Sequence, residues 1–112
     1  MADLFTKYIS AKGDKVNRLR VRLYYDLGGI NYFTYKNEPR GYYLSVTPEE
    51  VSDRGNGFIC VSTTMFSGIK ALVKNVQRQS KKSAEEAIKL AEPKIQQLVD
   101  YVCNKEGIEV LE

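Results

Sequence analysis

Residues 18–24 alternate strictly between apolar side chains and side chains that are basic or aromatic. Successive residues of a β-strand point to opposite faces of a sheet, so this pattern predicts a strand with two unlike faces. The chain must therefore fold around a sheet that buries the apolar face. The other face is either a solvated surface or a surface for a negatively charged partner. The apolar face carries Leu19, Val21 and Leu23, and the opposite face carries Arg18, Arg20, Arg22 and Tyr24.

The length of the chain, 112 residues, fits one domain spanning 1–112. Hydrophobic residues make up 43% and charged residues 28%, which is typical of a globular protein rather than a disordered one. No apolar run is long enough for a secretory signal or a transmembrane helix. The two cysteines, Cys60 and Cys103, form no paired motif. We therefore expect both to be reduced and buried in a cytoplasmic protein that makes no membrane contact.

Histidine is absent from the sequence. It is the commonest general base and the commonest metal ligand, so its absence excludes Ser-His-Asp and Cys-His catalytic sites within this chain. Two cysteines are too few for a thiolate zinc site. The adjacent acids Glu49 and Glu50 are interpreted as loop solvation, and Glu85 and Glu86 as helix capping. We therefore expect no enzyme activity, no cofactor and no metal ion.

Four strands are predicted, over 16–27, 30–36, 42–47 and 58–65. The pair Gly28-Gly29 predicts a two-residue hairpin turn between the first two strands, because such turns require positive φ. Pro48 is expected to end the third strand, since proline cannot donate a ladder hydrogen bond. Together the four strands would form an antiparallel meander.

The predicted hairpin also determines which side chains are neighbours across the strands. A two-residue turn places Tyr24 opposite Phe33 and Arg22 opposite Tyr35. The row of arginines would then lie beside aromatic rings. The later strands would add Tyr43 and Phe58 to the same face.

Helices are predicted in three places. Residues 3–10 have the spacing of a short amphipathic helical turn. In 67–79 the apolar residues are spaced by 3, 1 and 3, which favours a helix, although a strand is the alternative. The last helix begins at a capping box, with Ser83 as N-cap and Glu86 three residues later. Its apolar stripe continues past Pro93, which is expected to kink it, and Gly107 is expected to end it.

These elements predict an α+β fold. A four-stranded antiparallel meander would be followed by a short basic helix and by a long C-terminal helix packed on one sheet face. The stripe of the long helix would cover the face that carries Leu19, Val21 and Leu23. The order of four strands followed by a helix is similar, in topology alone, to the Whirly and PUR-repeat proteins that bind single-stranded DNA. The resemblance implies a function but assigns no residues.

The open face of the sheet would combine guanidinium groups with aromatic rings. Guanidinium groups neutralise phosphates and aromatic rings stack on unpaired bases, so this face suits single-stranded DNA or RNA. Two alternatives remain: an ordinary solvated face, and a protein interface such as that of a homodimer. The residues predicted to stack on bases are Tyr24, Phe33, Tyr35 and Tyr43, and those predicted to contact phosphate on this face are Arg18, Arg20 and Arg22.

A second basic feature lies in residues 54–84, which hold six cations and no acid. If 67–79 is a helix, Lys70, Lys74 and Arg78 form a row at four-residue spacing. Such a row binds phosphate backbones without reading sequence, and the alternative is a solvated helix face. The sequence therefore predicts a small, homodimeric nucleic-acid-binding protein. The alternative is a protein-interaction or inhibitor module, for example one from a mobile element, that binds a host protein through the same face.

Overall fold

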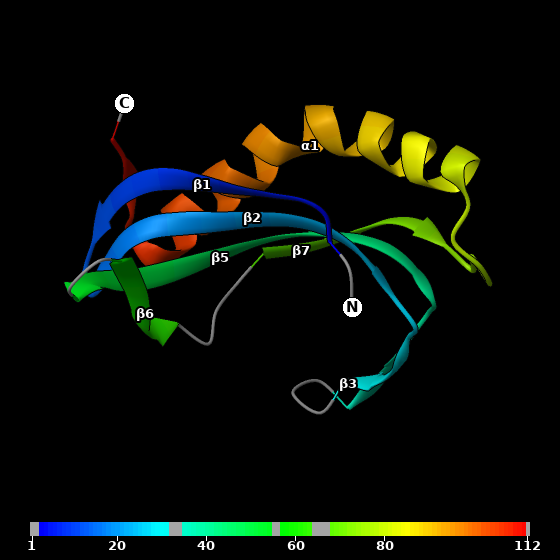
Figure 1. Ribbon diagram of the computed structural model, residues 1–112, viewed down its shortest axis with the longest axis horizontal. Helices are drawn as coiled ribbons and strands as arrows, with labels where there is room; N and C mark the ends of the chain where they lie inside the picture. The colour runs from blue at the N-terminus through cyan, green and yellow to red at the C-terminus, as the bar shows by residue number, and fades with distance from the viewer. Residues whose placement is uncertain (1–2, 32–34, 55–56, 64–67, 112) are drawn as a thin grey trace.

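The computed structural model of the chain describes residues 3–31, 35–54, 57–63 and 68–111. An antiparallel sheet and one long helix packed on it confirm the α+β prediction (Figure 1). The strands are β1 (Asp3–Gly13), β2 (Val16–Asp26), β3 (Gly29–Asn31), β4 (Lys36–Glu38), β5 (Gly41–Arg54), β6 (Gly57–Thr63), β7 (Gly68–Lys74) and β8 (Glu109–Val110), and the helix is α1 (Lys81–Glu106).

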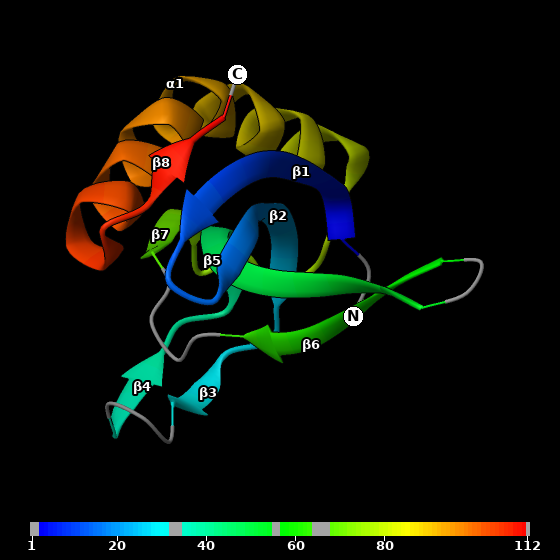
Figure 2. The same ribbon diagram turned by 90° about the vertical axis from the view of Figure 1, so that its left-hand side faces the viewer.

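The main sheet has six strands rather than the four predicted. Their order is β6-β5-β2-β1-β8, and β7 also pairs with β5. β5 pairs with β7 through residues 41–46 and with β6 through residues 49–54. The short strands β3 and β4 form a separate hairpin. Figures 1 and 2 show this hairpin below the main sheet, on the face away from α1.

The core lies between α1 and the main sheet, as Figure 2 shows most clearly. Leu19, Val21 and Leu23 of β2 are completely buried, which confirms the predicted apolar face. The stripe of α1 contributes Ala87 and Val99 among its buried residues. α1 covers one face of the main sheet, and no helix of the described ranges covers the opposite face, on whose side the β3–β4 hairpin lies.

α1 continues through Pro93 and ends at Glu106. Gly107, which follows the helix, has a left-handed φ of 67°, as expected of a C-terminal glycine. The start of the helix differs from the prediction. Ser80, not Ser83, is the N-cap: its hydroxyl accepts a hydrogen bond from the Ser83 backbone N–H. The Ser83 hydroxyl accepts one in return from the Ser80 backbone N–H, so the capping box begins three residues earlier.

The predicted helical turn over 3–10 is wrong, because these residues belong to β1, which pairs with β2. The register shifts between Asp3 and Phe5, where the strand is irregular. Both Leu4 and Phe5 pack against the core as a result, although they are adjacent in sequence. This irregularity breaks the alternation expected of a strand and produces spacing that resembles a helix.

The predicted hairpin at Gly28-Gly29 is also wrong. Both glycines have positive φ, 79° and 118°, as expected, but the chain does not return along β2. It leaves the main sheet, forms the β3–β4 hairpin, and rejoins at Gly41, which pairs with Asp26. β5 therefore takes the place predicted for residues 30–36 beside β2.

This change replaces the predicted cross-strand neighbours. Tyr24 lies opposite Tyr43, and Arg22 lies opposite Ser45. Phe33 falls outside the described residues, and so does the side chain of Phe58. The predicted Arg22–Tyr35 pair does not form, because β5 occupies that position.

Pro48 does not end β5, which continues to Arg54. The proline is buried and lies opposite Leu19. On its other edge β5 pairs with β7 up to residue 46 and with β6 from residue 49. Proline therefore falls in the gap between two partner strands, where no ladder N–H is required on that edge.

The helix predicted over 67–79 is wrong, because residues 68–74 form the strand β7. Leu72 is an extra residue in the pairing with β5: Ala71 lies opposite Tyr43, and Val73 lies opposite Tyr42. This bulge interrupts the alternation of β7 and creates the 3, 1, 3 spacing. Gly68 allows α1 to approach β7 closely, because a Cβ added there would lie 2.6 Å from Leu98 Cδ1.

Candidate functional site

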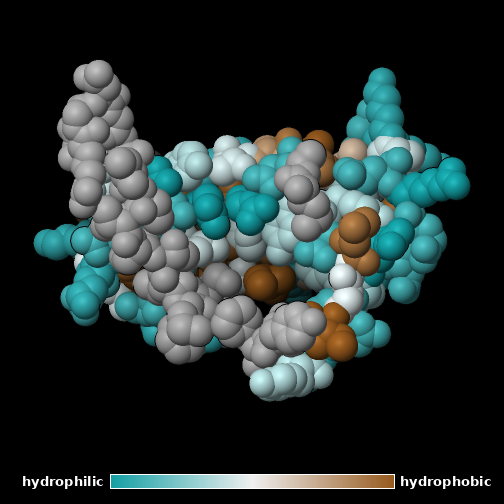
Figure 3. Space-filling model, turned by 60° about the horizontal axis from the view of Figure 1, so that its bottom comes forward, coloured by the Kyte–Doolittle hydropathy of each residue, from teal (hydrophilic) through white to brown (hydrophobic). Residues whose placement is uncertain are grey.

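Figure 3 looks onto the sheet face opposite α1, which we call the outer face. Hydrophilic side chains run across it, with separate hydrophobic patches between them (Figure 3). The three arginines of β2 lie on this face, because they alternate with the buried residues of the same strand. Their contacts determine whether the face has charge available for a partner.

Two of these arginines bind one buried carboxylate. Arg18 Nε lies 2.8 Å from Glu49 Oε1, and Arg20 Nη1 lies 3.2 Å from Glu49 Oε2. Glu49 is only 1% exposed, so its charge depends on these two partners. The interpretation of Glu49 as loop solvation is wrong, because β5 extends past Pro48 and places Glu49 opposite Arg18.

Arg22 is paired in the same way at the other end of the row. Its Nε and Nη2 donate to the Asp3 carboxylate at 3.0 and 2.8 Å. This hydrogen bond lowers the pKa of the Asp3 carboxyl and raises the pKa of the Arg22 guanidinium. The row therefore carries three cations and two anions, which leaves little net charge for phosphate binding.

The described aromatic rings of the outer face contact arginines or one another, and only Tyr8 among them is more than half exposed. The guanidinium of Arg18 lies 4.1 Å from the ring centroid of Tyr8, and that of Arg22 lies 4.7 Å from that of Tyr24. Tyr24 stacks on Tyr43 at 6.0 Å. Tyr43 is 6% exposed, and its hydroxyl donates to the backbone oxygen of Pro39. Tyr43 is therefore not accessible to a base, contrary to the prediction.

A second group of cations lies along β7 and the start of α1, and we call it the basic edge. All five side chains are exposed. Within the described part of the chain, none of them forms a salt bridge. Lysines on an edge strand also oppose strand pairing with other chains, which is their ordinary structural role. The basic edge consists of Lys70, Lys74, Arg78, Lys81 and Lys82.

Arg40 connects the basic edge to the β3–β4 hairpin. Its Nε donates to the Leu27 backbone oxygen and its Nη1 to the Gln77 backbone oxygen, both at 3.2 Å. Its own backbone oxygen accepts from the Val76 N–H at 3.1 Å. Tyr25 reinforces the contact, since its hydroxyl donates to the Val76 oxygen at 2.5 Å. Arg40 therefore holds the start of the hairpin against the segment that carries Arg78.

The β3–β4 hairpin and its base expose apolar side chains. Leu27 and Ile30 are each about three-fifths exposed, and Tyr35 is 83% exposed. Of the residues predicted to contact nucleic acid, Tyr35 lies at the tip end of this hairpin, directly before β4, and Arg40 joins the other end of the hairpin to the segment that carries Arg78. The structure does not bring the three arginines of β2 into that group, because β5 lies between β2 and β7.

The sequence interpretation missed Glu49, Asp3 and Arg40. Extending the alternation of β5 past Pro48 would have placed Glu49 on the outer face. No local pattern marks Asp3 as the partner of Arg22, because the two residues belong to different strands. The role of Arg40 likewise depends on contacts with residues 27, 76 and 77, which become neighbours only in the folded chain.

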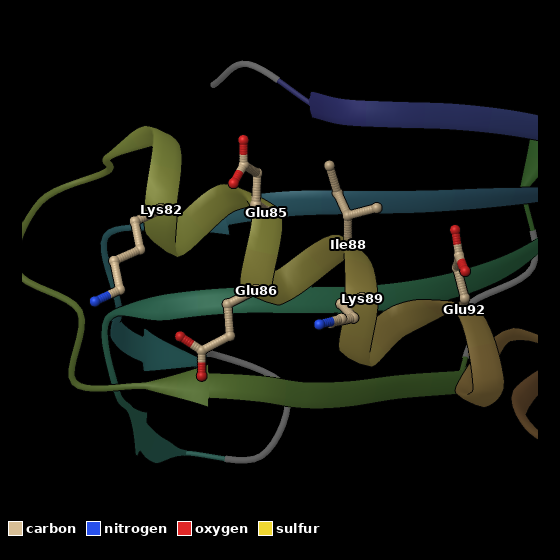
Figure 4. Close-up of a pocket in the computed structure, with 6 residues that line it drawn as sticks. All are labelled: Lys82, Glu85, Glu86, Ile88, Lys89 and Glu92. Atoms are coloured by element: carbon tan, nitrogen blue, oxygen red, sulfur yellow. The ribbon is translucent and has the colours of Figure 1, made fainter.

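A shallow depression on α1 is a weaker candidate for a site. Its lining combines acids and lysines around Ile88. Figure 4 shows Lys82 and Glu85 pointing to opposite sides of the helix rather than toward one point. The three acids Glu85, Glu86 and Glu92 oppose an anionic ligand there.

Two further features bear on the chemistry available. Cys103 is free and half-buried, and burial raises the pKa of its thiol, so it is not an activated nucleophile. The predicted burial of Cys60 concerns a side chain outside the described residues. Over the described ranges, no three acids or cysteines gather into a potential metal site. In the same part of the chain, α1 is not apolar enough to cross a membrane.

Among the described residues, the basic edge thus supplies five exposed cations without a salt bridge, and the β3–β4 hairpin supplies the exposed ring of Tyr35. Comparisons of the chain with known protein families, with curated proteins and with solved structures find no match.

Proposed function

We propose that this chain is a non-enzymatic protein that binds single-stranded nucleic acid through the basic edge. The observation that carries the proposal is the contrast between its two sets of cations. The arginines of β2 are paired with Glu49 and Asp3, whereas the five cations of the basic edge are exposed and form no salt bridge with a described residue. Exposed, unpaired cations are the groups that neutralise phosphates.

The charge distribution supports a polyanionic partner. Residues 54–84 contain six cations and no acid, so no carboxylate from this segment offsets the field of the basic edge. Each phosphate that a lysine or arginine neutralises on a single strand changes the slope of log K against log salt concentration by about −0.7. A strand that contacts all five cations would give a slope of about −3.5.

The test is fluorescence anisotropy with a labelled single-stranded oligonucleotide over a series of salt concentrations. A triple variant, Lys70→Gln with Lys74→Gln and Arg78→Gln, is expected to weaken binding and to make the salt slope less steep by about 2. The matched control has the same net charge and alters exposed lysines elsewhere, at Lys12, Lys15 and Lys89. No binding by the wild type at about 50 mM salt would contradict the proposal. Equal weakening by the control would contradict the assignment to the basic edge.

The second candidate function is that of a protein-interaction module, such as an inhibitor that binds a host protein. The exposed apolar residues Leu27, Ile30 and Tyr35 favour it, because such side chains gather at protein interfaces. This function predicts a contact with little salt dependence that is lost on Ile30→Ser.

We also propose that the chain is cytoplasmic and homodimeric. Sedimentation of the purified protein tests the dimer.

A further inference from the structure

Tyr35 differs from the other aromatic residues that the structure describes. It is 83% exposed, the largest exposure among their large hydrophobic side chains. Its φ of 56° lies in the left-handed region, which bulky residues rarely adopt. Within the described ranges it forms no hydrogen bond and no ring contact. Tyr35 is therefore a strained residue whose ring is mostly exposed to water, and no hydrogen bond or ring contact with another described residue compensates for the strain.

The hairpin that carries Tyr35 is held close to the basic edge. Arg40, two residues after β4 ends, binds both Leu27 and Gln77, and Gln77 adjoins Arg78. Tyr35 lies five positions before Arg40, which is at most roughly 17 Å of extended chain. One short oligonucleotide can therefore reach both the ring of Tyr35 and the cations of the basic edge.

We infer that an unpaired base stacks on Tyr35 and that this contact gives the site its preference for single strands over duplexes. The inference rests on the proposed function, since the basic edge supplies the phosphate contacts. Every base has an aromatic face, so stacking on Tyr35 is tolerant of sequence. In a duplex the base faces are already stacked on one another, and the basic edge alone would bind it.

The test exploits the absence of tryptophan from the sequence. Tyr35→Trp introduces a single tryptophan, whose fluorescence is expected to be quenched by an oligothymidine and not by a duplex. Tyr35→Ala is expected to weaken binding of the oligothymidine by about 5-fold or more. Duplex binding and the salt slope should stay unchanged, because no phosphate contact is lost. Tyr101→Ala is the matched control, since Tyr101 is an exposed tyrosine on α1.

Tyr35→Gly separates a binding role from a structural one. Glycine adopts positive φ without strain, so this variant should keep or raise the melting temperature while it loses single-strand affinity. A fall in melting temperature of both the alanine and glycine variants would overturn the inference by showing that Tyr35 supports the fold. Wild-type binding that Tyr35→Ala leaves intact would also overturn it and leave the proposed function standing. Absence of any wild-type binding would overturn both.

Discussion

The buried carboxylate of Glu49 provides the sharpest test of how the outer face is held together. Glu49→Gln keeps the shape of the side chain and removes its charge. The hydrogen bond from Arg18 then loses its ionic character, and the ion pair with Arg20 is lost. The variant also leaves two guanidinium groups without a counter-ion at the centre of the sheet, where β2 pairs with β5.

The expected loss of stability follows from these contacts. A hydrogen bond to a charged group contributes about 1.5–3 kcal/mol. The Arg18 and Arg20 side chains are 27% and 32% exposed, so water partly compensates both of them. The amide oxygen of glutamine also still accepts one bond. We therefore expect a loss of about 2–3 kcal/mol, below the 3–5 kcal/mol of a completely buried pair.

Thermal unfolding measures this loss directly. An unfolding entropy of about 2.1 cal/mol/K per residue converts it into a fall of about 8–13 °C in Tm. Glu86→Gln is the control, because Glu86 is an exposed acid on α1 whose loss should change stability by less than about 0.5 kcal/mol. If Glu49→Gln is no more destabilising than Glu86→Gln, the argument that Glu49 anchors the arginine row is refuted.

Two other predictions concern the packing of α1 and the tyrosines of the outer face. Gly68→Ala should destabilise the protein by about 1–3 kcal/mol in chemical denaturation. The added Cβ would lie 2.6 Å from Leu98 Cδ1 and 2.8 Å from Val102 Cγ2. An unchanged denaturation midpoint would contradict the close approach of α1 to β7. Burial raises the pKa of Tyr24 and of Tyr43 above the usual 10 of tyrosine. Around and above pH 10 the folded state therefore binds more protons than the unfolded state, so the free energy of unfolding should fall as pH rises. Between pH 8 and pH 11, the denaturation midpoint should fall less in Tyr24→Phe than in the wild type. Equal falls in the two proteins would contradict the role of Tyr24 in this loss of stability.

The elements that the sequence predicted well are those with an undisturbed period. β2 alternates from Arg18 to Asp26, and the stripe of α1 keeps its phase past Pro93, so the sequence predicts both elements together with their buried faces. β1 and β7 were missed for one shared reason. Each contains a register shift in its pairing, and one extra residue is enough to turn alternation into a spacing that resembles a helix.

The topology error has a different cause. Gly28-Gly29 has the positive φ values that a tight hairpin needs, and the local prediction was correct to that extent. The chain nevertheless inserts the β3–β4 excursion before β5 returns to pair with β2. Local turn chemistry does not distinguish a two-residue turn from the start of a longer excursion, because both begin with the same backbone conformation.

The same distinction between local and distant contacts explains which cations are available for a partner. A charge at the centre of an antiparallel sheet has neighbours on both sides, so it can be paired by residues that are far away in sequence. Glu49 lies 31 residues from Arg18, and Asp3 lies 19 residues from Arg22. Among the described strands β7 pairs with β5 alone, and the segment around it contains no acid. The alternating arginines of β2 have the sequence pattern of a binding surface, but their position at the centre of the sheet lets carboxylates from other strands pair with them. The pairing of the arginine row therefore favours a structural role for it, and the exposed cations of the basic edge carry the binding that we propose.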